Sequence, residues 1–338
     1  MNRTYKLSNA LYIVLALACF LPIRAFQAPQ ALSFDSKAGA RVSVATLRQD
    51  RGGIASLNLL YGAGGKEHQP AGKFTFVKED TQGSSPKFEI VDEQGVRWKA
   101  KLGEEAQSET AATRLVWAAG YFTDEDYYFA KLRVQKMPRL ERGRQHVSAG
   151  VVHGVRLERV VNGRKKSGDW SWFKNPLAGT RELNGLRIMM ALMNNWDLKD
   201  VNNVIYEEKG EHSRYAISDL GATFGRTGNA LSRSKSNLRD YRRSKFIQSV
   251  TAKNVDFFLS SRPFFPITVN VPYYRTRTNM QEIVKDIPRA HARWLGGVLS
   301  QLSLEQIRDC FRAGGYSRAE VEGFAKVVQI RIAALTRL

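Results

Sequence analysis

The sequence predicts an α+β fold of two lobes, in which a small antiparallel sheet carrying one helix is followed by a mostly helical lobe. Apolar and polar side chains alternate in three consecutive segments, as they do in strands that are buried on one face. These segments are 74–79, 87–91 and 97–102. Helical periodicity follows at 104–119. Helical patterns also dominate the last third, where S-L-E-Q at 303–306 and S-R-A-E at 317–320 match the capping box that begins helices.

Composition is that of a globular protein with a strong positive charge. The chain has 338 residues, 43% apolar and 25% charged, and a formal net charge of +20. Such a charge favours an anionic partner: a nucleotide, an anionic membrane surface or an acidic polymer. The basic residues are spread along the chain and form no known nucleic-acid-binding motif, so we do not expect nucleic acid as the main partner. The sequence leaves the oligomeric state undetermined.

The N-terminus has the composition of an export signal. Arg3 and Lys6 precede an apolar run from Ala10 to Leu21, which is short for a membrane span. Cleavage after Ala25, a lipobox-like A-L-A-C at 16–19 and an uncleaved anchor remain open alternatives. We therefore expect an exported or membrane-anchored protein, in a compartment that is poor in ATP.

The remaining chain divides into three parts after this signal peptide or anchor of residues 1–25. Residues 26–72 form a lead-in segment that we expect to pack on the first lobe, with strands at 41–47 and 54–61. Residues 73–165 form the first lobe and 166–338 the second, because 161–168 is polar and rich in turn residues. Two cysteines without a C-x-x-C pattern and five scattered histidines make a zinc site unlikely to form.

One stretch has the composition of a phosphoryl-transfer site. Residues 194–203 read N-N-W-D-L-K-D-V-N-N, and D-L-G follows at 219–221. Phosphoryl transfer needs a carboxylate that orients the attacking group, and an amide oxygen and a second carboxylate that hold Mg²⁺. Asp197, Asn202 and Asp219 supply these groups in that order. The same residue types also occur in ordinary turns.

This stretch resembles the protein-kinase-like superfamily, and its atypical branches more than the ordinary protein kinases. Residues 195–202 are similar to the N-x-D-x-x-x-x-N loop of HipA-like kinases, and D-L-G with Phe224 to the D-F-G region of phosphatidylinositol kinases. The resemblance covers roughly residues 73–225. It implies that Asp197 orients or deprotonates the acceptor, that Asn202 and Asp219 bind metal, and that Lys199 neutralises the transferred group.

The resemblance extends to the first lobe. The loop 81–87 is similar to the G-x-x-P-K loop of HipA-like kinases, which implies that Ser84, Ser85 and Lys87 contact phosphates; a plain hairpin turn is the alternative. Lys101 matches the lysine of V-A-I-K, and Lys99 lies on the same strand face. Of the acids in the following helix, Glu109 resembles the lysine's partner most, with Glu105 as the alternative.

Further elements complete the expected fold. Strands at 127–134 and 147–160 close the first lobe, a helix at 181–194 leads to Asp197, and a hairpin of 204–206 and 215–218 brings Asn202 and Asp219 to one metal. The basic segment 222–246 favours an anionic or membrane-associated acceptor. Residues 264–274, broken by two prolines, read as an extended connection. We expect no chemistry after about residue 246.

The function expected from these residues is an ATP- and Mg²⁺-dependent (or Mn²⁺-dependent) kinase-like phosphotransferase whose acceptor the sequence does not identify. Two alternatives stay open. Asn195 replaces the usual histidine and the glycine loop is atypical, which fits a pseudokinase or a nucleotide-binding module. Nucleotidyl transfer needs the same metal–nucleotide residues and cannot be separated from phosphoryl transfer by sequence.

Overall fold

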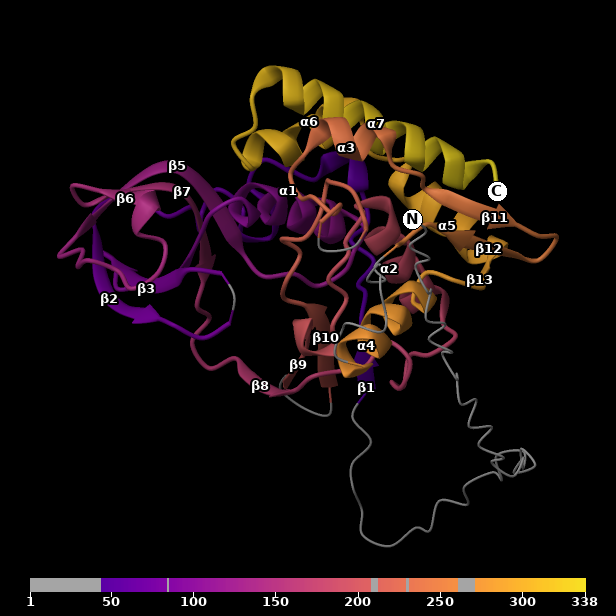
Figure 1. The fold of residues 1–338 in the computed structure, drawn as a ribbon, viewed down its shortest axis with the longest axis horizontal. Coiled ribbons are helices and arrows are strands. Elements are labelled where there is room, and N and C mark those ends of the chain that lie inside the picture. The colour runs from indigo at the N-terminus through magenta and orange to yellow at the C-terminus, as the bar shows by residue number, and fades with distance from the viewer. Residues whose placement is uncertain (1–43, 84, 208–211, 229–230, 261–270) are drawn as a thin grey trace, which may run out of the picture. The chain divides into compact units, whose positions relative to one another are not determined.

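A closed sheet forms the first part of the fold. The computed structural model describes residues 44–338 except 84, 208–211, 229–230 and 261–270. The strands are β2 (Phe74–Asp80), β3 (Lys87–Asp92), β4 (Arg97–Leu102), β5 (Asp126–Gln135), β6 (Val147–Ser148) and β7 (Val151–Arg159). They lie in the order β4-β3-β2-β5-β7-β6, and β4 also pairs with β7. Five strands thus form a closed ring, the barrel sheet (Figure 1).

Alternation along the strands decides which side chains fill the barrel sheet. In β4, Trp98, Ala100 and Leu102 are buried, whereas Lys99 and Lys101 point to the other face. The inward residues belong to a core cluster with Phe88, Ile90, Val155 and Leu157. The lysines of β4 are therefore presented outside the barrel, towards the rest of the chain.

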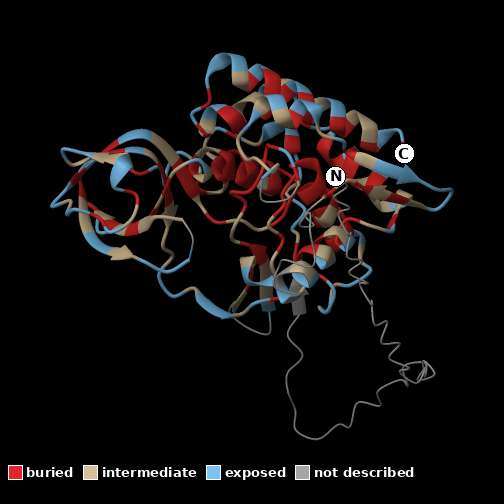
Figure 2. Cartoon of the chain, in the orientation of Figure 1, coloured by how far each residue is buried: buried red, intermediate tan, exposed pale blue. Residues whose placement is uncertain are grey.

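One helix links the barrel sheet to the helical part. Helix α1 (Glu105–Ala118) follows β4 and is buried along most of its length, as Figure 2 shows in red. It contacts β4, β5 and β7 on one side and α6 (Leu304–Ala313) on the other. The position of α1 therefore couples the β4 lysines to the helical part of the fold.

A larger hydrophobic core lies among the helices. It is built by α1, α2 (Arg181–Leu192), α5 (Arg289–Leu299), α6 and α7 (Arg318–Thr336), with α3 (Leu238–Arg243) and α4 (Val271–Glu282). Helices α6 and α7 lie side by side (Figure 1). Both expected capping boxes are present, at Ser303–Gln306 and Ser317–Glu320, which explains why α6 and α7 begin where they do.

Two smaller sheets and four single-turn helices complete the described fold. One sheet has the order β1-β10-β9-β8 and the other β11-β12-β13. Their bounds are β1 (Val44–Thr46), β8 (Lys165–Gly168), β9 (Asn203–Glu207), β10 (His212–Ile217), β11 (Ile247–Val250), β12 (Asn254–Phe257) and β13 (Ile287–Pro288). The single turns are η1 (Ile54–Ser56), η2 (Gly62–Gly64), η3 (Arg144–His146) and η4 (Asp200–Asn202).

The expected α+β composition is confirmed, and so are the three consecutive antiparallel strands β2, β3 and β4. The expectation of a purely antiparallel sheet is wrong in one place, because β2 and β5 pair in parallel at Phe74 and Thr75. The two lobes stay a prediction. The buried apolar residues form two clusters, but residues 42–338 make one compact unit.

Three expectations outside the sheet need correction. Residues 54–61 form η1 and turns instead of a strand, since Gly52 and Gly53 turn the chain in the left-handed region just before them. The lead-in packs on the barrel sheet through Tyr61 and η2, but its Leu47, Ile54 and Leu59 join the larger core. Residues 271–274 begin α4, where Pro272 is tolerated in the first turn.

The rest of the expected connection, 264–270, lies outside the described residues. So does the predicted export signal at 1–25. In the part of the chain that the structure describes, no helix is both long and apolar enough to cross a membrane.

Candidate active site

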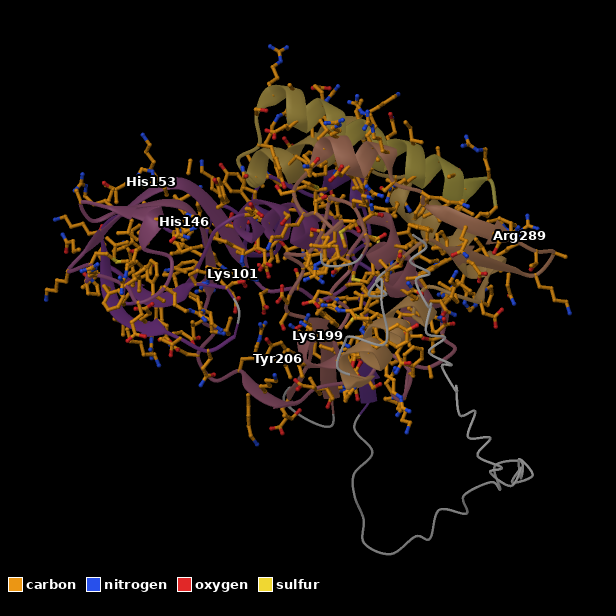
Figure 3. All side chains as sticks on the ribbon, in the orientation of Figure 1. Lys101, His146, His153, Lys199, Tyr206 and Arg289 are labelled. Atoms are coloured by element: carbon orange, nitrogen blue, oxygen red, sulfur yellow. The ribbon has the colours of Figure 1, made fainter. Side chains whose placement is uncertain are left out.

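A cavity of about 530 Å³ brings the sequence-predicted residues together. Its lining includes Lys101, Glu109, Asp197, Asn202 and Asp219. We call it the central cavity. Ser85, Lys87 and Lys199 line it as well, whereas Ser84 lies outside the described residues. In Figure 3, Lys101 comes from the barrel sheet, and Lys199 and Tyr206 come from the side of β9.

Lys101 is the charged centre of this cavity. Its Nζ lies 2.9 Å from Glu105 Oε2, 2.9 Å from Glu109 Oε2 and 3.2 Å from Asp219 Oδ1. Burial disfavours the charged form, but the three carboxylates outweigh it and raise the pKa of Lys101 above its ordinary value. Lys101 is therefore a fixed cation, and Lys99, the alternative on the same strand, pairs with Glu158 instead.

Both candidate glutamates of α1 contact Lys101, and their surroundings differ. Burial raises the pKa of the Glu109 carboxyl to about 7, against the opposing charges of Arg156 and Lys101. Burial also acts on Glu105, but Lys101 and Lys235 overcome it and lower that pKa to about 2. Glu105 is consequently an anion throughout the physiological range, and the carboxyl of Glu109 has the higher pKa of the two.

Buried charged residues on the barrel sheet support the position of Glu109. Arg156 Nε lies 3.3 Å from Glu109 Oε2, and Arg156 NH1 lies 3.1 Å from Asp126 Oδ2. Asp126 also accepts a 2.6 Å bond from Arg114 of α1. Because β4 and β7 pair with Lys101 opposite Arg156, the closure of the barrel sheet places this arginine beside the Lys101–Glu109 pair.

The loop before β3 is held against this centre. Ser85 Oγ donates to Glu105 Oε2 at 2.8 Å, and Arg142 donates to the carbonyl oxygens of Gly83 and Ser85 at 2.6 Å. Lys87 pairs with Asp80 at 3.2 Å across the hairpin. The loop is thus a hairpin turn, and its Ser85 and Lys87 line the central cavity. This geometry is compatible with a plain hairpin turn and with a loop that contacts phosphates.

Helix α2 delivers Asp197 to the cavity. The helix ends at Leu192, and Asn194 turns the chain with a φ of 56°. Asn195 accepts a hydrogen bond from the backbone N–H of Asp197 at 3.1 Å. The Asp197 carboxylate then lies 2.8 Å from Lys199 Nζ and 3.4 Å from Arg277 NH1.

The hairpin β9–β10 brings Asn202 and Asp219 to the same end of the cavity. The N–H of Ser218 donates to the carbonyl of Asn202 at 2.9 Å. The Asn202 side-chain amide donates to the Asp197 carbonyl at 2.8 Å, which leaves its Oδ1 oxygen for another partner. An amide oxygen and a carboxylate are donors that Mg²⁺ and Mn²⁺ accept, usually completed by water and phosphate oxygens. The residues fit such a metal.

A metal site can also be formed by protein side chains alone, with three or more of them as ligands. Among the described residues, no group of three or more His, Cys, Asp or Glu side chains could hold an ion.

Sequence analysis missed several residues that contact the predicted ones. Arg277 of α4 pairs with Asp197, so a residue beyond 246 contacts the predicted site, and the expectation of no chemistry there stays a prediction. Lys235 of the basic segment lies 2.9 Å from Glu105. Arg156 showed only as a strand residue. Arg156 lines the central cavity, whereas Arg277 and Lys235 contact Asp197 and Glu105. The contacts of all three bridge long separations in the sequence, so no local pattern signals them.

Comparison with known proteins finds distant likenesses among solved structures. No protein-family model matches the chain, and no curated protein does either. Among solved structures, the chain is similar to the Helicobacter pylori proinflammatory kinase CtkA, with 10% identity and a TM-score of 0.45 over 79% of this chain and 98% of that one. It is also similar to the Golgi casein kinase with Mn/ADP bound, with 11% identity and a TM-score of 0.32 over 78% and 73%. Both likenesses are too weak to carry a functional argument.

Proposed function

We propose that the chain is a kinase-like phosphotransferase of two lobes that uses a nucleoside triphosphate and Mg²⁺ or Mn²⁺. ATP is the nucleotide that the sequence resemblance implies. The observation that supports the proposal is the convergence of Lys101, Glu109, Asp197, Asn202 and Asp219 on one cavity. These groups come from separate parts of the chain, namely β4, α1, the loop after α2, η4 and the loop after β10, and phosphoryl transfer requires them together.

Each residue has a role that follows from its surroundings. Lys101, held by Glu109, is a fixed cation that contacts phosphate oxygens on binding. Asn202 and Asp219 would hold the metal, which neutralises phosphate charge when bound. Asp197 accepts the proton of, or orients, the attacking hydroxyl. Lys199, 2.8 Å from Asp197, adds positive charge where the transferred group passes.

An anionic acceptor is supported by a second cavity of about 530 Å³ beside Trp196, which we call the Trp196 cavity. Arg233 and Lys235 line it, and the Arg233 guanidinium lies 4.1 Å from the centre of the Trp196 ring. Trp196 directly precedes Asp197 in the chain. A negatively charged segment of the acceptor would be drawn to these cations and brought next to Asp197.

The test compares two alanine variants. Asp219→Ala should abolish Mg²⁺-dependent nucleotide binding, measured as a ligand-induced rise in melting temperature, because it removes the anionic metal ligand. Asp197→Ala should keep nucleotide binding but lower turnover by about a hundredfold or more, since its role is towards the acceptor. Asp309→Ala, which breaks an exposed ion pair with Arg312 on α6, is the control and should leave both readouts unchanged.

The same assay separates the alternatives. Release of pyrophosphate in place of a nucleoside diphosphate would indicate nucleotidyl transfer. A pseudokinase would bind nucleotide without turnover, and Asp197→Ala would then match the wild type. If no nucleoside triphosphate raises the melting temperature with either metal, the proposed function fails.

A further inference from the structure

The central cavity has a second end that the phosphotransferase residues do not use. One step along the same face of β4 leads from Lys101 to Lys99, and the paired step on β7 leads from Arg156 to Glu158. On the other side of the cavity, Asn202 ends η4, and Val204 and Tyr206 of β9 share one strand face. Lys99, Glu158, Val204 and Tyr206 all line the cavity. If phosphates lie at Lys101 and Asn202, the base of the nucleotide lies at this far end.

The far end is polar, which sets it apart from most ligand pockets. Ligand cavities are usually lined by apolar side chains with a few polar groups. Here Val201 and Val204 are the aliphatic residues that line the cavity within the described chain, and charged residues prevail. The charged side chains of the far end are Lys99, Asp124, Glu158 and Lys166. A base bound there must be recognised by hydrogen bonds as well as by stacking.

The Asp124 carboxylate can accept further hydrogen bonds. Its residue is 8% exposed, and the contacts of its carboxylate among the described residues are long, 3.4 Å from Tyr206 OH and 3.5 Å from Arg164 NH1. Both contacts fall on Oδ1. The neighbouring Asp126 offers a contrast, because it accepts bonds of 2.6 to 3.1 Å and its side chain is fully buried. Asp126 is a structural ion, whereas Asp124 faces the cavity.

A cation stands near this carboxylate. Lys99 Nζ makes one ion pair, 3.2 Å from Glu158 Oε1, and its side chain is 54% exposed. An ammonium group has three donors, so Lys99 can donate to a ligand while it keeps Glu158. In its ionised form the Asp124 carboxylate only accepts hydrogen bonds, so the far end then offers an acceptor and a donating cation in one cavity.

This pair of groups matches guanine better than adenine. The guanine edge presents the O6 acceptor next to the N1–H and N2 amino donors, whereas adenine presents one amino donor next to the N1 acceptor. An ionised carboxylate can accept both guanine donors at once, but it would face the lone pair of adenine N1. Adenine also has no carbonyl oxygen for a lysine.

We propose that Asp124 reads the base of the bound nucleotide and that the central cavity prefers guanine to adenine nucleotides. The inference rests on the proposed function, and it replaces ATP by GTP as the preferred substrate. Lys99 donates to the base oxygen, and the phosphates remain at Lys101. Arg164, whose guanidinium lies 4.7 Å from the Tyr206 ring centre, holds the chain segment after β7 against β9 and so closes the far end.

The test is a change of base preference. Binding of GTP, ATP and xanthosine triphosphate with Mg²⁺ is measured by calorimetry at pH 8, above the raised pKa of the Asp124 carboxyl, for the wild type and Asp124→Asn. Xanthine has an oxygen in place of the guanine N2 amino group, so an asparagine amide is complementary to it. The wild type should bind GTP more tightly than ATP. Asp124→Asn should lose roughly tenfold or more in GTP affinity, the effect of one charge-assisted hydrogen bond, and should gain affinity for xanthosine triphosphate.

The controls make each outcome decisive. Asp309→Asn, far from the cavity lining, should behave as the wild type. A gain for xanthosine triphosphate cannot result from misfolding, so it supports the inference even if Asp124→Asn is less stable. If the wild type prefers ATP and Asp124→Asn leaves that preference unchanged, base reading by Asp124 is wrong while the phosphotransferase proposal stands. If no triphosphate binds, both proposals are wrong.

Discussion

Glu105 joins three parts of the molecule through one carboxylate. It accepts a hydrogen bond from Ser85 of the loop before β3 and pairs with Lys101 of β4 and Lys235 of the basic segment. Glu109, one helical turn later, is fully enclosed and serves Lys101 and Arg156. The two glutamates therefore have different tasks. Glu109 fixes the lysine, and Glu105 ties the neighbouring segments to it.

Asp124 should make stability depend on pH. Burial, with the nearby charge of Glu158, raises the pKa of its carboxyl to about 7, whereas an unfolded aspartate has a pKa near 3.9. Between those values the folded protein holds a proton that the unfolded chain has lost. The contribution of this carboxyl to stability is therefore lost as the pH rises from about 4 to about 7, and is constant above.

Urea unfolding at a series of pH values checks this expectation. Asp124→Asn cannot titrate, so the free energy of unfolding of the wild type should fall relative to that of the variant, at up to about 1.4 kcal/mol per pH unit. The groups that face Asp124 are Arg156 and Glu158 of β7, Lys99 of β4, Arg164 and Tyr206. A difference between the two proteins that stays constant from pH 4 to pH 8 would contradict the raised pKa.

Helix α7 holds the loop that carries Asp197 through one buried arginine. Its Arg331 is 3% exposed and donates to the Leu192 carbonyl and the Asn194 side chain, each at 2.8 Å, and to Ser244 Oγ at 2.8 Å. The last carbonyls of a helix have no partner within it. Arg331 therefore caps α2 and fixes the turn that leads to Asp197, from a helix more than 130 residues away in sequence.

We expect Arg331→Met to weaken both stability and activity. Each buried polar group left without a partner costs about 1–3 kcal/mol, so the free energy of unfolding should fall by at least that amount. Turnover should fall more than nucleotide affinity, because the loop that carries Asp197 is displaced. Lys326→Met, at an exposed position of the same helix, is the control for chemical denaturation and steady-state kinetics. Unchanged unfolding of Arg331→Met would exclude the capping role.

The whole molecule carries a large positive charge. The formal net charge of +20 is accompanied by exposed arginines on α3, namely Arg239, Arg242 and Arg243. Each basic side chain near an anionic membrane contributes about 1 kcal/mol to binding. These residues extend the positive charge of the segment that contains Lys235, and we expect this face to bind an anionic membrane surface.

Vesicle co-sedimentation tests this expectation. The protein should bind vesicles rich in phosphatidylserine and be released by high salt, since the attraction is screened. Replacing the three α3 arginines by glutamine should weaken binding by about tenfold or more. The same replacement at exposed Lys131, Arg133 and Lys136 near β5 removes equal charge. If both triple variants lose binding equally, net charge alone and not the α3 face is responsible.

The sequence by itself determined the features that local periodicity and spacing encode. Strands β2, β3 and β4, helix α1, both capping boxes and the hairpin β9–β10 follow from side-chain alternation, helical period and turn residues, because these act between near neighbours. The spacing of Asp197, Asn202 and Asp219 likewise follows from one hairpin. The predicted residues Lys101, Glu109, Asp197, Asn202 and Asp219 of the central cavity were therefore identifiable from the sequence, and their catalytic roles stay predictions.

Tertiary structure alone decided which distant charges meet. The pairing of β4 with β7 places Arg156 behind Glu109, and the packing of α4 brings Arg277 to Asp197. Asp126 begins β5 and Asp124 lies two residues before it. Asp126 is tightly paired with Arg114 and Arg156, whereas the contact of Asp124 with Arg164 is long. Such contacts join residues that are far apart in the sequence. Their electrostatic and packing free energies depend on neighbours that no local sequence pattern specifies.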